Sequence, residues 1–262
     1  MAASQVCIDT HDYMTTVTIN RPEKRNALTY DLFRELKATM QRLGDDPQTR
    51  VVVIRGAGTR AFSAGMDLGD VLQGIQERPD RPIDHELVHG TMQAVEAHPN
   101  PVIAMINGDA FAGGCELALH CDFRFMADHA RIGMPLAKRG LLIPFPLVQK
   151  LVHMVGPVAT SEILLRGAPL SAQRAHELNM VHRVLPSEQL EPETMALATE
   201  LAANAPVSVR GFKQMIATAA QAHAERHEQA MHELMVQGMN SADAKEGLQA
   251  FLEKRAPQYT GR

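Results

Sequence analysis

Two glycines placed just before a carboxylate are the feature of this sequence that most directly suggests chemistry. They lie in residues 110–118, where Gly113 and Gly114 precede Glu116 at the start of a helix predicted over about residues 115–120. Glycines let backbone N–H groups approach a ligand oxygen closely, and the helix dipole adds positive potential there. Such a loop could stabilise a developing oxyanion beside a general base, or it could be only a tight strand-to-helix connection.

A second glycine-rich loop favours the first of these interpretations. The apolar run 51–55 predicts a strand, Gly56 and Gly58 follow it, and Gly65 precedes Met66. Gly56 and Gly58 also fit a loose dinucleotide-binding pattern after a strand. That pattern requires a helix that starts inside the motif, whereas residues 61–69 form a glycine-rich stretch, so we reject a dinucleotide site.

Several blocks, in one order, resemble the crotonase, or enoyl-CoA hydratase/isomerase, superfamily over nearly the whole chain. The blocks are residues 20–28, 61–68, 101–108, 111–117, 121–122 and 246–255. The resemblance implies an α/β fold, a crotonase-like spiral of ββα repeats with a helical C-terminal subdomain. It also implies that the backbone N–H groups of Met66 and Gly113 form an oxyanion hole for a thioester oxygen.

Leu136 is the main departure from the pattern of that family. Hydratases of the family carry a second glutamate downstream of the first, and the matching position here is Leu136. The isomerases normally keep the second carboxylate and lack the first, so this sequence shows the opposite arrangement. The resemblance therefore implies a site that works with one carboxylate, Glu116.

The chemistry that the resemblance implies is formation of an enolate from a coenzyme A thioester, without a metal or a redox cofactor. One carboxylate could take a proton from water and return a proton to the α-carbon, so the predicted function is enoyl-CoA hydration. Isomerisation by one base, another lyase or hydrolase reaction such as decarboxylation, and acyl-CoA binding without catalysis remain alternatives. We expect His85 and His89, in segment 70–99, to be polar residues on a surface helix, although they could supply a further reactive group.

Other residues match family positions that contact the substrate or its coenzyme A. They are Lys24, Arg25, Ala64, Asp67, Leu68, Leu136, Phe251 and Lys254. Lys24 and Arg25 would supply cations for the phosphates, whereas Phe251 and Lys254 would reach the site from a neighbouring subunit. The resemblance implies a homotrimer or a hexamer of two trimers, with coenzyme A present only as part of the substrate.

Composition restricts the partners and the compartment. The chain has 262 residues, of which 45% are hydrophobic, and a formal net charge of −4, so it offers a sizeable core and no basic stripe for nucleic acid. Its three cysteines, Cys7, Cys115 and Cys121, are scattered, which favours a reducing compartment. The start lacks a signal-peptide pattern and no apolar run reaches membrane-spanning length. We therefore expect a cytoplasmic protein without a membrane partner.

Strand and helix patterns alternate along the first two thirds of the chain, which indicates an α/β architecture. Strands are predicted at about 14–19, 51–55, 102–106, 122–126 and 181–185, and a helix at 29–43 with Thr29 as its N-cap. Helices are predicted at about 188–204, 206–221, 224–239 and 241–255, the last with Ser241 as a possible N-cap. We expect a core for thioester binding and catalysis over residues 1–187, and a helical subdomain for oligomerisation and coenzyme A contact over 188–262.

Overall fold

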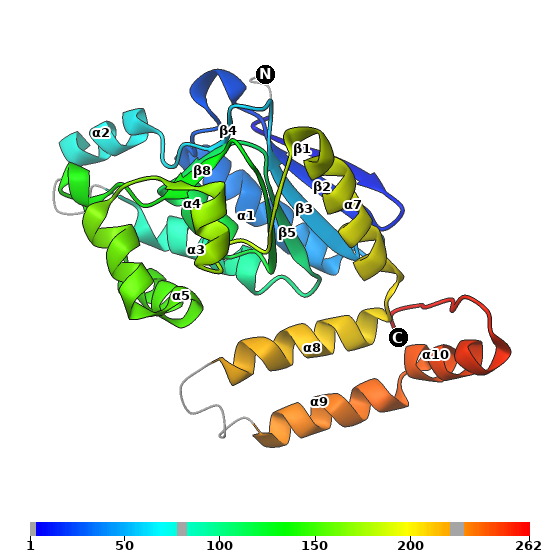
Figure 1. Cartoon of the computed structure of the whole chain (residues 1–262). Helices are drawn as coiled ribbons and strands as arrows, with labels where there is room; N and C mark the ends of the chain where they lie inside the picture. The colour runs from blue at the N-terminus through cyan, green and yellow to red at the C-terminus, as the bar shows by residue number, and fades with distance from the viewer. Residues whose placement is uncertain (1–3, 78–82, 221–227) are drawn as a thin grey trace.

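Two β-sheets surrounded by helices form the chain in a computed structural model that describes residues 4–77, 83–220 and 228–262 (Figure 1). The strands are β1 (Val6–His11), β2 (Met14–Ile19), β3 (Val51–Gly56), β4 (Ala61–Ser63), β5 (Val102–Ile106), β6 (Asp109–Phe111), β7 (Phe123–Ala127), β8 (Arg131–Gly133), β9 (Leu170–Ser171) and β10 (Arg183–Leu185). The α-helices are α1 (Tyr30–Asp45), α2 (Leu68–Glu77), α3 (His85–Glu96), α4 (Gly113–Leu119), α5 (Phe145–Arg166), α6 (Ala172–Glu177), α7 (Ser187–Ala203), α8 (Pro206–Ala219), α9 (Glu228–Asn240) and α10 (Ala242–Glu253). Two short 3-10 helices are η1 (Pro22–Lys24) and η2 (Ala137–Arg139).

The larger sheet contains the long apolar strands that the sequence predicts. Its order is β1-β2-β3-β5-β7-β10, with β1 and β2 antiparallel and every other neighbouring pair parallel. All five residues of β5 and the first four of β3 are buried. Parallel strands covered on both faces need such uninterrupted apolar runs, because neither face meets water.

The smaller sheet explains how the loops of the site come together. Its order is β4-β6-β8-β9, and β4, β6 and β8 run parallel. Each of these three strands follows a strand of the larger sheet and precedes a helix, giving the units β3-β4-α2, β5-β6-α4 and β7-β8-α5. This confirms the predicted spiral of ββα repeats. Because carboxyl ends of parallel neighbours lie at one edge, the loops after β4, β6 and β8 meet there.

Helix α1 forms where the sequence predicts it and for the predicted reason. The Thr29 side chain accepts a hydrogen bond from the Leu32 N–H at 3.1 Å, so Thr29 is the N-cap. The buried apolar residues that follow lie on one face of the helix, since most of them are three or four positions apart: Leu32, Phe33, Leu36, Met40 and Leu43. This apolar face packs into the core shared with the larger sheet.

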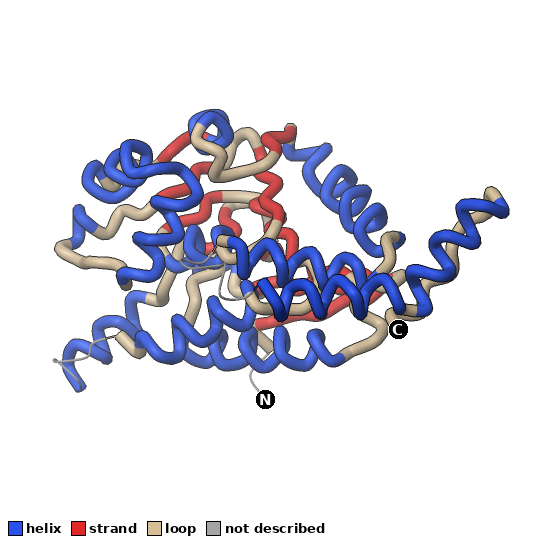
Figure 2. Tube along the Cα trace, turned by 90° about the horizontal axis from the view of Figure 1, so that it is seen from below, coloured by secondary structure: helices blue, strands red, loops and turns tan. Residues whose placement is uncertain are grey.

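The C-terminal helices divide into one that covers the larger sheet and three that stand below it. Helix α7 contributes Leu190, Ala198 and Ala202 to the main core. Helices α8, α9 and α10 lie below the sheets, and α8 runs beside α9 in both views (Figures 1 and 2). Lys213 of α8 donates to Asp122, just before β7, at 2.6 Å. The end of the chain returns to α10, where the Gly261 N–H donates to Asp243 at 3.1 Å. The main body therefore extends through α7, and only the helices after it project.

Segment 70–99 has more structure than the sequence analysis identified. It includes most of α2 and all of α3, and α3 buries Val88, Thr91, Met92 and Val95 at helical spacing.

The glycines after β3 do not open a helix. Strand β4 follows them instead, which agrees with the rejection of a dinucleotide-binding motif at Gly56 and Gly58. No helix in the described residues is both long enough and apolar enough to cross a membrane.

Two glycines provide a direct test of this packing. A Cβ on Gly114 would lie 2.7 Å from the Ser63 Cβ and against the Ser63 backbone, which cannot move cheaply, so we expect Gly114→Ala to lose about 1–3 kcal/mol of unfolding free energy. A Cβ on Gly90, inside α3, would meet only the end of the flexible Lys37 side chain at 2.9 Å. Gly90→Ala should therefore be neutral or gain up to about 1 kcal/mol. Urea unfolding of both variants measures the contrast, and equal effects would contradict it.

Candidate active site

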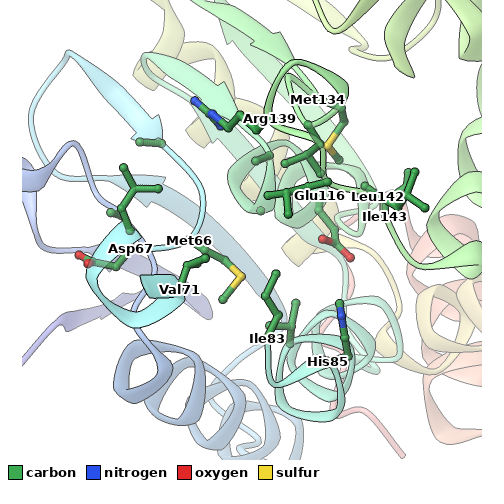
Figure 3. Close-up of a pocket in the computed structure, with 18 of the residues that line it drawn as sticks. Met66, Asp67, Val71, Ile83, His85, Glu116, Met134, Arg139, Leu142 and Ile143 are labelled. Carbon is green, nitrogen blue, oxygen red and sulfur yellow. The ribbon is translucent and has the colours of Figure 1, made fainter. Parts of the chain in front are cut away.

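A single cavity of about 650 Å³ collects most of the residues that the sequence analysis proposed for the site (Figure 3). Its walls come from the loop before α2, the starts of α3 and α4, and the segment between β8 and α5. The predicted residues that line it are Lys24, Arg25, Ala64, Met66, Asp67, Leu68, Gly113, Glu116 and Leu136. The repeats therefore bring together segments that are more than 100 residues apart in the chain.

The backbone N–H groups of Met66 and Gly113 are available to a ligand. Among the described residues, neither donates a hydrogen bond to the protein. Gly113 opens α4, so its N–H has no intrahelical acceptor, and the helix dipole adds positive potential beside it. A Cβ on Gly113 would lie 3.6 Å from the Met66 nitrogen, which places the two donors side by side. This arrangement can hold one anionic oxygen.

Gly65 makes the approach of these two loops possible. It has φ of +92°, a conformation that favours glycine, and a Cβ there would lie 2.8 Å from the Phe111 carbonyl oxygen. On the other side of the loop, the Leu28 N–H donates to the Gly65 oxygen at 2.8 Å and the Asp67 N–H donates to the Leu28 oxygen at 2.9 Å. Met66 lies between these bonds, so its N–H direction is fixed by its neighbours.

Two buried asparagines, which had no role predicted from the sequence, hold the connection between β3 and β4. The Asn26 side-chain amide donates to the carbonyl oxygens of Ala57 and Ala61 at 3.0 and 2.7 Å. Asn107 accepts from the Gly56 N–H at 3.0 Å and donates to the Gly56 oxygen at 2.8 Å. An amide can satisfy a buried donor and a buried acceptor at once. Both residues lie in blocks quoted for the family resemblance, which was the available signal.

Glu116 points into the cavity from the first turn of α4 (Figure 3). Its carboxylate has no hydrogen bond or ion pair within the described part of the chain. Burial raises the pKa of Glu116 to about 7, because the charged form loses hydration without gaining a partner. The backbone behind it is anchored instead: His120 Nδ1 lies 2.8 Å from the Glu116 carbonyl oxygen. A carboxylate with this pKa can both accept and release a proton near neutral pH.

The wall around Leu136 is apolar. Leu136 is half-buried and precedes η2, and Met134, Leu141, Leu142 and Ile143 line the cavity with it. Val71, Ile83 and Val88 add apolar surface from α2 and α3. This chamber fits a hydrocarbon chain beside Glu116, and no described side chain at position 136 or its neighbours supplies a second carboxylate.

The charged residues of the cavity lie mainly around the loop that carries Met66. Lys24 and Arg25 end η1 and line the cavity. Burial alone would raise the pKa of Asp67, but hydrogen bonds from Arg21 and the Gly69 N–H outweigh it and lower the pKa. The Arg21 guanidinium donates hydrogen bonds to the Asp67 carboxylate at 2.9 Å and to the Ala27 carbonyl oxygen at 2.7 Å. Asp67 thus braces the loop as well as lining the cavity.

Two predicted coenzyme A contacts, Phe251 and Lys254, belong to the C-terminal part of the chain, whereas His85 lies at the cavity. Phe251 belongs to α10, with its side chain outside the described part, and exposed Lys254 follows that helix. Lys254 is not among the lining residues, and the backbone of α10 lies far from α2 and α4 (Figure 1). His85 is exposed at the start of a helix, as expected, and it also lines the cavity; His89 is exposed on the same helix and is not among the lining residues.

Comparison with known proteins finds relatives that match nearly the whole chain. The family model described as enoyl-CoA hydratase/isomerase matches residues 9–262. The chain is similar to the crotonyl-CoA hydratase of Syntrophomonas wolfei, with 31% identity over 99% of both chains, and to the carnitinyl-CoA dehydratase of Proteus mirabilis, with 32% identity over 97% and 98%. Among solved structures, an enoyl-CoA hydratase from Bacillus anthracis gives a TM-score of 0.92 at 33% identity. The match covers 99% of this chain and 100% of that chain.

The unpaired carboxylate gives a prediction about stability and pH. Because the pKa of Glu116 rises from 4.5 to about 7 on folding, its contribution to stability is full below about pH 4.5 and is lost as pH rises through 7. At about pH 8 the ionised, partly buried group should cost on the order of 2–3 kcal/mol. Glu116→Gln should therefore stabilise the protein at about pH 8 and change little at about pH 5. Thermal melts at both pH values measure this, and an equal shift at both would contradict it.

Proposed function

The chain belongs to the enoyl-CoA hydratase/isomerase family, and from this premise we propose that it hydrates the C2=C3 double bond of an enoyl-CoA thioester with Glu116 as its only carboxylate. The observation that carries this proposal is that two free backbone donors, Met66 N–H and Gly113 N–H, share one cavity with Glu116. The donors would hold the thioester oxygen. Glu116 would act at the carbons next to it.

The reaction uses the two donors mainly in its transition state. Attack of water on the β-carbon moves the double-bond electrons toward the thioester, so negative charge develops on its oxygen. Fixed N–H groups stabilise that charge, and one such donor contributes roughly 2.7–4 kcal/mol in other enzymes. Glu116 takes a proton from the attacking water and then gives a proton to the α-carbon, which restores the thioester carbonyl and the resting carboxylate.

The same single base could instead move a proton between C2 and C4, which is isomerisation, so the assay must separate the two. Wild type is incubated with a 2-enoyl-CoA and a 3-enoyl-CoA, and the products are separated by chromatography and then identified by mass: hydration adds one water, and isomerisation gives a product of unchanged mass that elutes with the other isomer. Hydrated product from the 2-enoyl substrate supports the proposal. Isomerisation alone assigns the second function, and no turnover with retained binding assigns a non-catalytic acyl-CoA binder.

Glu116→Gln tests the role of the carboxylate. The amide keeps the size of the side chain but cannot accept the water proton, so kcat should fall by about 10²-fold or more with little change in the Kd of a saturated acyl-CoA. In wild type, activity that requires the ionised carboxylate should fall as pH drops through about 7. Full activity of Glu116→Gln would contradict the assigned role.

Lys24 and Arg25 are proposed to face the phosphates of coenzyme A. Calorimetry with a saturated acyl-CoA should give a Kd on the order of micromolar. Lys24→Gln should raise that Kd about two- to fivefold, more at low salt than at high salt, and leave kcat unchanged. Arg42→Gln, which removes an exposed positive charge on α1 that does not line the cavity, is the control. Equal effects of both variants would contradict a phosphate contact.

We further propose that the chain assembles as a homotrimer or as a hexamer of two trimers in the cytoplasm. Helices α8 and α10 support this, because Phe212, Ile216 and Leu248 expose 64, 69 and 70% of their surfaces. Assembly would cover such apolar surface and would bring Phe251 and Lys254 to a neighbour's site. The free cysteines Cys7, Cys115 and Cys121 suit a reducing compartment.

A further inference from the structure

His85 occupies a fixed place opposite Glu116. It is the first residue of α3, and the N-cap Asp84 accepts a hydrogen bond from the Leu87 N–H at 3.1 Å. The Asp84 N–H donates to the Tyr30 hydroxyl at 3.2 Å, which ties this helix start to α1. In Figure 3 the His85 ring and the Glu116 carboxylate point toward one another from opposite walls of the cavity. Thus the backbone at His85 is held in place, and its side chain faces the Glu116 carboxylate.

The other charged side chains of the cavity do not share this position. Asp67 is engaged by Arg21 and by the Gly69 N–H. Figure 3 shows the Arg139 guanidinium directed away from Glu116. Lys24 and Arg25 lie on η1 and carry no acceptor atom in their side chains. Within the described cavity wall, His85 is therefore the side chain that faces Glu116 and can accept a hydrogen bond through a neutral ring nitrogen.

Hydration needs the attacking water to be held at two points. One hydrogen bond leaves the water free to rotate about that bond, and the wall at Leu136 is apolar. His85, on α3, approaches from the side opposite to Glu116, and being exposed it also keeps contact with solvent water. A water between these two groups can direct one O–H bond to each and its oxygen lone pair to the β-carbon.

We propose that His85 is the second water-binding residue of this site and takes the place of a carboxylate at position 136; this rests on the proposed hydratase function. Glu116 accepts one water proton as the oxygen bonds to the β-carbon, and the double-bond electrons pass into the enolate held by Met66 and Gly113. Glu116 then delivers that proton to the α-carbon. The second O–H bond, directed at a ring nitrogen of His85, stays intact and becomes the product hydroxyl, so no net proton is gained or lost.

Four variants test this proposal on one substrate, the 2-enoyl-CoA that wild type hydrates. His85→Ala should lower kcat about 10- to 100-fold, the effect of losing one hydrogen bond to a reacting group, with KM within about twofold. His85→Gln, which keeps an acceptor, should retain more activity than His85→Ala. His89→Ala, one turn further on the same exposed helix start, should keep wild-type kcat. Added imidazole should restore part of the activity of His85→Ala and none of the activity of Glu116→Gln.

A double variant separates a shared water from two independent effects. If Glu116 and His85 hold one water, Glu116→Gln with His85→Ala should be little slower than Glu116→Gln alone, because residues that act as a unit are not additive. Wild-type kcat in His85→Ala, or equal losses in His85→Ala and His89→Ala, would overturn the role of His85 and leave the hydratase function standing. Failure of wild type to hydrate any 2-enoyl-CoA would overturn both. Matched thermal melts ensure that the rates compare folded protein.

Discussion

The close contact between two backbone segments, residues 63–67 and 111–114, is the constraint on which the rest of the structure depends. No side chain could replace it, since the contact consists of main-chain atoms separated by little more than van der Waals distance. Gly65 and Gly114 permit it because a Cβ at either position would meet the opposing segment. Ala112, between them, has φ of +48°, an unusual value for a residue with a Cβ, which is strain of the kind found at functional sites. Two unpartnered N–H groups side by side are the result.

Buried polar side chains hold the main chain around that contact, although they lie among apolar core residues. Asn26 and Asn107 are almost fully buried, at 1 and 7% exposure, and their amides donate to carbonyl oxygens at the end of β3 and at the start of β4. On the far side of α4, His120 contacts the Glu116 carbonyl and approaches Glu96 of α3 at 3.6 Å. Burial lowers the pKa of His120 to about 4, so it serves as a neutral hydrogen-bonding group. These contacts fix the main chain while leaving the Glu116 carboxylate unsatisfied.

The parts of this fold that the sequence predicts are those with strong local signals. Apolar β-branched runs predict β2, β3 and β5 almost to the residue, and the Thr29 cap predicts the start of α1. The three-residue strands β4, β6 and β8 carry too little periodicity to be recognised alone, because their pairing is decided by the loops of neighbouring repeats. A surface helix was expected around His85 and His89, but its apolar face was not recognised, although the buried residues of α3 have helical spacing, and so the place of His85 at the cavity was not predicted. The pairing of Met66 with Gly113 came from family resemblance; composition and periodicity contain no signal for it.

Because the cavity is assembled from successive repeats, one side chain of its wall can differ while the two backbone donors proposed for the oxyanion keep their places. The donors belong to the loops after β4 and β6, Leu136 belongs to the loop after β8, and His85 belongs to α3, which the first repeat inserts between its own strands and the next. Exchange of a carboxylate for an apolar side chain at position 136 therefore alters one wall without disturbing the contact between Gly65 and α4. A group that replaces its function can come from any element that reaches the same volume, and α3 reaches it from the opposite side. In this architecture the backbone fixes the two N–H donors proposed for the oxyanion, whereas the side chains that face the same cavity come from separate elements.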